Sequence, residues 1–307
     1  MVTVRGIGRG LAFALVLMMA LSLSAQQLYI SNEPKQSLQL LNLTTTPAKL
    51  TTLFTVGTGK LDDLTVNAAG QLIYSVPSTG SVYLYDPTSG INTLLVTGLK
   101  YARDLEIEPG GQTMLIGIYS PGSIVRYDFG TGTTTVLANL GAELKKLGTC
   151  DGEPCPHTST CDGIAYDPYG NLYAVANHNF IVQIDPVTGA ILNTLFLEPA
   201  HGINGGDGLT YDSYTGNLWA THDGTLGLGV LEIPVTAVGL GSTFSFYLTP
   251  TLKQSGSAPD GIKSDGKGNL YIGAIHTAAV YNIPTNTITA NIVVNGADGV
   301  SLVPGTY

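Results

Sequence analysis

Charged side chains are scarce in this 307-residue sequence, and only 11% of its residues are Asp, Glu, Lys or Arg. The 22 acids outnumber the 13 lysines and arginines, the formal net charge is −9, and no basic cluster occurs. Nucleic acid and anionic membrane surfaces bind basic patches, so we expect neither as a partner. An acidic chain of this kind suits a cation, a neutral sugar or a lactone-type molecule better.

Long apolar runs are missing beyond the N-terminus. In residues 1–25, two arginines precede an apolar stretch of about 13 residues and a small-residue end. A transmembrane helix needs about 20 apolar residues, so this segment is interpreted as a secretory signal peptide, cleaved near Ala25, rather than as a membrane anchor. The sequence therefore predicts a secreted or periplasmic protein with one domain, residues 26–307. We expect a monomer without membrane insertion.

Helical periodicity is almost absent, and only Gly141 to Leu147 has the pattern of a helical turn. The chain instead holds 39 glycines and many threonines. This composition is typical of an all-β chain of short strands joined by many turns.

One unit recurs along the chain, formed by an apolar run, a tight turn and a second apolar run. Its clearest copy is CDGIAYDPYGNLYAVAN at Cys161–Asn177, where proline presets φ and glycine or asparagine supplies the positive φ of a hairpin turn. Further copies are at Val66–Ser75, Tyr211–Ala220 and Ser264–Gly273. An aspartate precedes each repeat, and these aspartates are Asp63, Asp104, Asp162, Asp207, Asp260 and Asp298.

These aspartates are 38 to 58 residues apart, and strand-rich repeats near 40 residues indicate the blades of a β-propeller. We predict six blades of four antiparallel strands. The first blade, begun by Gln27–Leu43 and Leu50–Val56, lacks an Asp-Gly strand, whereas Ala297–Val303 begins like a blade and stops. Pairing this C-terminal strand with the N-terminal strands would close the ring and leave no open sheet edge.

Strand order predicts which face of the propeller carries function. The start of the first strand and the end of the second lie on one side of a blade, together with the aspartates and the long connections 141–161, 198–206 and 250–259. The short turns lie on the other side, where we expect no room for a pocket. Functional residues tend to lie on loops held by a rigid scaffold, so the aspartate face is the candidate.

The six aspartates predict a metal site at the mouth of the central channel. Crowded carboxylates repel one another and raise one another's pKa, and a divalent cation with oxygen ligands would relieve this. We expect calcium first, with zinc or manganese as alternatives. The structural alternative is that each aspartate accepts hydrogen bonds from backbone N–H groups and joins one blade to the next.

All five histidines fall on the aspartate face. His178, His222 and His276 end second strands, and His157 and His201 lie in long loops. A histidine there could act as a general base near neutral pH or ligate zinc, or it could only bond a loop.

The three cysteines lie close together in CDGEPCPHTSTC. An exported protein favours an oxidised pair. We predict one disulfide within Cys150, Cys155 and Cys161, and we favour Cys150 to Cys161, which would anchor the long loop beside Asp162. A zinc site with His157, or three free thiols, are the alternatives.

With its repeats aligned, most of residues 26–303 resembles the six-bladed propellers of the senescence marker protein and gluconolactonase superfamily. The match is best at PDGIKSDGKGNLYIG, Pro259–Gly273. The resemblance implies that Asp260 helps to bind a divalent metal and acts near a lactone ring. This chain departs from the family by placing its N-terminal acid, Glu33, in SNEPK and by having aspartate where asparagine is expected. NHL-repeat propellers also share the GNLY signature, but the residues that continue it in those propellers are absent from this chain.

The leading hypothesis is a metal-dependent hydrolase of lactone-type esters. Asp260 and a histidine from His201, His222 or His276 would assist the cation in activating water. The alternatives are a non-enzymatic propeller that binds a protein or glycan through its long-loop side, and a lyase with a histidine base and a metal-stabilised enolate.

Overall fold

The computed structural model describes residues 27–57, 59–150, 153–157, 159–197, 206–223, 228–249 and 258–307. The predicted signal peptide lies outside these residues and stays a prediction. Within the described ranges, no helix has the length and apolar character needed to cross a membrane.

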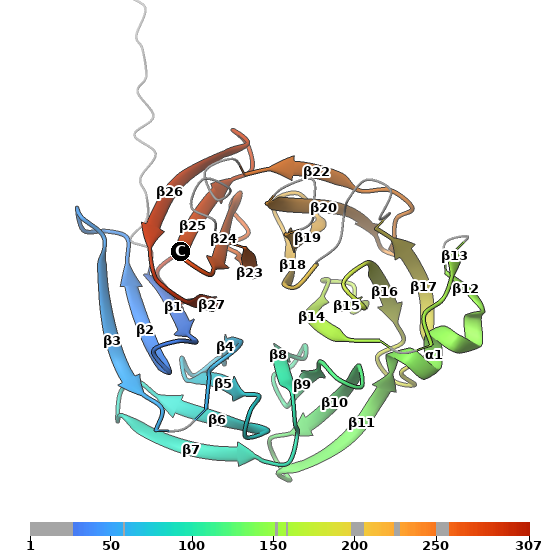
Figure 1. Ribbon diagram of the computed structural model, residues 1–307, viewed down its shortest axis with the longest axis horizontal. Coiled ribbons are helices and arrows are strands. Elements are labelled where there is room, and N and C mark those ends of the chain that lie inside the picture. The colour runs from blue at the N-terminus through green and yellow to red at the C-terminus, as the bar shows by residue number, and fades with distance from the viewer. Residues whose placement is uncertain are drawn as a thin grey trace, which may run out of the picture.

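Six four-stranded antiparallel sheets form a ring, which confirms the predicted six-bladed propeller (Figure 1). Each blade runs outwards from the channel. Blade 1 contains β27 (Ala297–Leu302), β1 (Gln27–Asn32), β2 (Ser37–Asn42) and β3 (Lys49–Thr55). Blade 2 contains β4 (Leu64–Val66), β5 (Leu72–Val76), β6 (Ser81–Asp86) and β7 (Ile91–Val96). Blade 3 contains β8 (Ala102–Ile107), β9 (Thr113–Ile118), β10 (Ser123–Asp128) and β11 (Thr133–Asn139).

The other three blades follow the same order. Blade 4 contains β14 (Cys161–Tyr166), β15 (Leu172–Ala176), β16 (Phe180–Ile184) and β17 (Ile191–Phe196). Blade 5 contains β18 (Leu209–Asp212), β19 (Asn217–His222), β20 (Gly229–Thr236) and β22 (Ser245–Leu248), with β21 (Gly239–Leu240) paired to the end of β20. Blade 6 contains β23 (Pro259–Ser264), β24 (Asn269–Ala274), β25 (Thr277–Asn282) and β26 (Thr287–Val293).

The C-terminal strand closes the ring as predicted. In β27, Val300 pairs with Ile30 and Leu302 pairs with Leu28 of β1. All four side chains are buried in one hydrophobic cluster between the first and last blades. Closure thus joins the two ends of the chain through both backbone pairing and apolar packing.

The repeated turns are built by their aspartates. The Asp167 carboxylate accepts hydrogen bonds from the backbone N–H groups of Tyr169 and Asn171, both at 2.9 Å. Asp265 accepts from Lys267 and Asn269 in the same way. Because this Asx-type bonding is local, the turn sequence alone determines where the hairpins fall.

A short insertion follows blade 3. Helix α1 (Leu140–Leu147) confirms the predicted helical turn, and the Asn139 side chain caps it by accepting from the Ala142 N–H at 3.0 Å. The hairpin of β12 (Thr149–Cys150) and β13 (Glu153–Pro154) follows.

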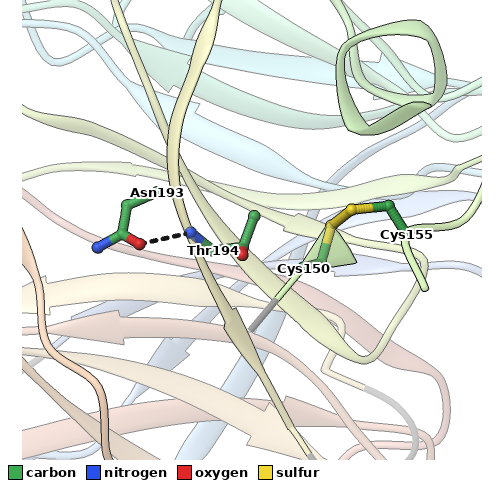
Figure 2. Close-up of a disulfide and its surroundings, with 4 residues drawn as sticks. All are labelled: Cys150, Cys155, Asn193 and Thr194. Atoms are coloured by element: carbon green, nitrogen blue, oxygen red, sulfur yellow. Dashed lines mark hydrogen bonds between the residues drawn. A yellow bond between two sulfur atoms is a disulfide. The ribbon is translucent and has the colours of Figure 1, made fainter. Parts of the chain in front are cut away.

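One disulfide within the three cysteines is confirmed, but the favoured Cys150–Cys161 pairing is wrong, because Cys150 pairs with Cys155. The β12–β13 hairpin brings their Cα atoms within 5.1 Å. Cys161 begins the innermost strand β14 and is a buried free thiol. Figure 2 shows the bridge beside Asn193 and Thr194 of β17.

This pairing predicts one free thiol per oxidised chain. Alkylation in denaturant without reductant should modify Cys161 alone, and mass spectrometry of peptides should find Cys150 joined to Cys155. Opening so small a loop should cost about 2 kcal/mol. Reductant should therefore lower the melting temperature of the protein and of Cys161→Ser, but not of Cys155→Ser. Three alkylatable thiols, or a bridge to Cys161, would contradict the assignment.

Candidate functional site

The six predicted aspartates occupy two layers of the channel rather than one ring. In β8, β14 and β23, the register shift after the first paired residue leaves two residues in a bulge. The first bulge residues are Arg103, Asp162 and Asp260, and the second are Asp104, Gly163 and Gly261. Asp104 therefore stands in the position of a glycine, as does Asp63 in the matching motif Leu-Asp-Asp-Leu at 61–64.

We call the outer set the rim layer and the next set the glycine layer. The rim layer consists of Asp62, Arg103, Asp162, Asp207, Asp260 and Asp298. The glycine layer consists of Asp63, Asp104, Gly163, Gly208, Gly261 and Gly299. Asp62, the rim residue of blade 2, was therefore not predicted, and the prediction that Asp63 and Asp104 lie at the rim is wrong.

Glycine is required in the second layer because adjacent innermost strands touch there. A Cβ atom on Gly208 would lie 2.4 Å from the Asp260 carbonyl oxygen. Asp63 instead joins blade 2 to blade 3, since its carboxylate accepts from the Leu105 N–H at 2.9 Å. This is the structural role that the sequence left open for these aspartates.

Seven carboxyl groups surround a narrow cavity of about 20 Å³ between the blades. They are Asp62, Asp63, Asp104, Asp162, Asp207, Asp260 and Asp298. Burial and the neighbouring carboxylates raise the pKa of Asp62, Asp104 and Asp298 well above the usual range.

Arg103 supplies positive charge within the rim layer. Its guanidinium nitrogens lie 3.7 Å from an Asp62 oxygen and 3.8 Å from an Asp162 oxygen. The guanidinium also lies over the Tyr119 ring, 4.2 Å from its centroid, an attractive cation–π arrangement. Arg103 is thus held between two blades and faces the channel mouth.

Asp162, His178 and Asp207 form a compact cluster at this mouth. His178 Nδ1 lies 3.1 Å from Asp207 Oδ1 and 3.5 Å from Asp162 Oδ2. The other ring nitrogen, Nε2, lies 3.3 Å from the Tyr119 hydroxyl. His178 has φ of 60° in the turn between β15 and β16. This left-handed backbone conformation is uncommon for a residue other than glycine.

The Asp162 side chain is only 3% exposed, and neither of its oxygens makes a hydrogen bond within the part of the chain that the structure describes. Burial raises the pKa of Asp162 to about 7. A hydrogen bond with Asp207 raises the pKa of His178 above its usual value. His178 and Arg103 approach this carboxylate only at 3.5 and 3.8 Å. Since burying a carboxylate with such long contacts is costly, the group has capacity for a closer cation.

The cluster fits a divalent metal. One ligand atom from each of its three residues lies within 4.8 Å of the other two. Carboxylate oxygens and imidazole nitrogen are ordinary ligands of zinc and manganese, and carboxylates of calcium. The sequence placed His178 on the correct face but did not include it in the site. Its contacts to Asp162 and Asp207 join two blades, which no local pattern reveals.

A cavity of about 250 Å³ opens next to the cluster. Glu33, Asp62, Arg103, Asp260 and Asp298 line it. Asp260 and Asp298 interact there, and burial raises the pKa of both. The structure therefore brings Asp260 and Glu33 to one cavity.

The remaining predicted histidines lie elsewhere. His201 lies outside the described residues. His276 is exposed on the turn between β24 and β25 and does not line the cavity. His222 is fully buried, its ring edge-on to Phe246 at a centroid distance of 4.9 Å. Neither ring nitrogen of His222 has a hydrogen-bond partner among the described residues, and burial lowers its pKa to about 4.

The expectation of a pocketless turn face is wrong. A cavity of about 270 Å³ opens at the opposite mouth of the channel, where the innermost strands end. One residue from each innermost strand lines it, so the cavity is a feature of the whole ring rather than of any one turn.

Solved structures share this fold at low sequence identity. One chain of a nidogen/laminin complex matches with a TM-score of 0.67 and 14% identity, over 91% of this chain and 98% of that chain. The virginiamycin B lyase of Staphylococcus aureus matches with a TM-score of 0.60 and 15% identity, over 90% of this chain and 88% of that chain. The hydrazine synthase of Kuenenia stuttgartiensis matches with a TM-score of 0.62 and 16% identity, over 90% of this chain and 86% of that chain.

Identities this low show the fold alone. No family model matches the sequence, and the comparison with curated proteins finds no match. The resemblance to gluconolactonases therefore stays a prediction.

Proposed function

We propose that the protein binds one divalent cation between Asp162, His178 and Asp207 and hydrolyses a small lactone-type ester in the adjoining cavity. The observation that carries this proposal is the buried Asp162 carboxylate, which makes no hydrogen bond within the described residues and meets His178 and Arg103 only at 3.5 and 3.8 Å. A cation would remove the cost of burying it. The histidine in the cluster favours zinc or manganese over calcium, which takes oxygen ligands.

A bound divalent ion supplies Lewis acidity toward a carbonyl oxygen. The side chains that line the 250 Å³ cavity would supply the general base and the group that stabilises negative charge. Asp260 would accept a proton from the attacking water as general base. The Arg103 guanidinium would stabilise the negative charge that develops on the ester oxygen. The lactone class itself rests on the resemblance of Pro259–Gly273 to gluconolactonases.

Elimination is the second candidate, favoured by the fold shared with virginiamycin B lyase. The same cation site would then stabilise an enolate, and a side chain of the cavity would remove a carbon-bound proton. A third candidate is non-enzymatic binding of a protein partner, favoured by the fold shared with a chain of the nidogen/laminin complex.

Product masses separate these candidates. Neutral sugar lactones and acyl lactones are incubated with the protein and calcium, zinc or manganese. Hydrolysis predicts a product heavier by one water, formed only with metal and at least tenfold more slowly by Asp260→Asn. A product of a ring-opening elimination would carry no added water. Metal binding without any product would overturn the enzymatic proposal and favour the binding module.

A further inference from the structure

The cavity at the opposite mouth of the channel is lined by a third layer of residues. One residue from each innermost strand contributes to this inner layer. Its members are Thr65, Glu106, Ala165, Thr210, Lys263 and Ser301. This layer lies beyond the glycine layer, on the side away from the candidate metal cluster, so the proposed hydrolase does not use it.

Three hydroxyl groups in the inner layer are without partners. Thr65, Thr210 and Ser301 are each more than nine-tenths buried. Among the described residues, none of their side chains forms a hydrogen bond, although each lines the cavity. The three hydroxyl oxygens are not themselves fully buried, so each can donate to and accept from whatever fills the cavity.

The charges of the inner layer balance. Lys263 Nζ lies 3.7 Å from Glu106 Oε2, and the two side chains are 17% and 23% exposed. This distance is too long for a strong hydrogen bond, so both groups keep bonding capacity toward the cavity. A charged ligand would meet a like charge at one of the two, whereas a neutral polar ligand would meet none.

Aromatic side chains surround the same mouth. Tyr166, Tyr211 and Tyr307 line the cavity. The turns beside it carry two more tyrosines, Tyr169 and Tyr214, which are 63% and 54% exposed. Tyr169 lies close enough to Tyr211 to raise its pKa further beyond the effect of burial. Tyrosine offers both an apolar ring face and a polar hydroxyl.

We propose that this mouth is a second binding site, which takes a neutral sugar the size of one pyranose ring. Free hydroxyl groups, a balanced pair of charges and a rim of tyrosines are the chemistry that recognises a polyhydroxylated ring. The cavity of about 270 Å³ is near the lower end of ligand sites, which span roughly 300–1,000 Å³. It suits one sugar ring or the terminal residue of a glycan.

Saturation-transfer NMR tests this site with methyl glycosides of glucose, galactose, mannose and N-acetylglucosamine, and with glycine and acetate as charged probes. We expect transfer to at least one glycoside and not to the charged probes. Thr210→Val keeps the side-chain shape and removes one hydroxyl, so it should weaken the binding at least tenfold. Lys263→Gln alters a second side chain of the same layer and should also weaken the binding.

The matched control lies at the other mouth. Asp162→Asn, which alters the proposed metal site, should leave glycoside binding unchanged, so the two proposals can fail separately. The sugar site would be overturned by the absence of transfer to every glycoside or by preferential binding of glycine or acetate. Binding that is unaffected by both Thr210→Val and Lys263→Gln in folded protein would also overturn it.

Discussion

Deleting residues 297–307 is expected to abolish the soluble, folded protein. The deletion removes β27 and exposes the backbone edge of β1 together with Leu28 and Ile30, which are fully buried. Burying one large apolar side chain contributes roughly 1.5–3 kcal/mol. The loss from these two and from Val300 and Leu302 is therefore on the order of the whole stability of a domain, about 5–15 kcal/mol.

Deleting only residues 304–307 is the control, because it leaves β27 intact. We expect this shorter deletion to remain soluble, with a melting temperature within a few degrees of the full chain. Solubility and circular dichroism of both deletions provide the readout. A soluble 297–307 deletion with unchanged melting temperature would contradict ring closure by β27.

His222 is expected to make stability fall steeply below neutral pH. Burial lowers its pKa from 6.5 to about 4, so the unfolded chain binds a proton before the folded one does. The buried, neutral His222 does not lower the free energy of unfolding above pH 6.5. As pH falls from 6.5 toward 4, protonation of the unfolded chain lowers this free energy. The shift corresponds to a contribution of about 3 kcal/mol.

Comparison with His222→Leu isolates this contribution. Buried carboxyl groups with raised pKa, such as Asp162, act in the opposite direction and are common to both proteins. The difference in unfolding free energy between wild type and His222→Leu should therefore change by about 3 kcal/mol from pH 7 to pH 4, in favour of the variant. Parallel pH profiles in urea unfolding would show that His222 is not buried in its neutral form.

The fold was predictable because its signals are local. The Asp-Pro-Tyr-Gly-Asn turn closes its own hairpin, because Asp167 accepts from Tyr169 and Asn171, two and four residues further on. Ring closure could be predicted because the first blade lacked an inner strand and the last repeat lacked a partner. Both features are visible without any knowledge of contacts across the molecule.

The site was less predictable because it depends on register and on contacts between blades. Asp62 and Asp63 are adjacent in the sequence, so the sequence does not indicate which of the two reaches the rim. The bulges that determine this appear only once the strands are paired. His178 lies 16 residues from Asp162 and 29 from Asp207, so no short motif joins them. The disulfide was mispaired because the β12–β13 hairpin, rather than loop length, selects the partner of Cys150.

Metal titration of chelator-treated protein tests the account most directly. Isothermal calorimetry with zinc, manganese and calcium should find one ion per chain. A ligand at one hundred times its dissociation constant should stabilise the fold by about 2.7 kcal/mol. Asp162→Asn should weaken binding at least tenfold, whereas Asp185→Asn, a turn residue on the opposite face, should not. Absence of binding and of thermal stabilisation with all three ions, or equal affinity in Asp162→Asn, would contradict the metal site.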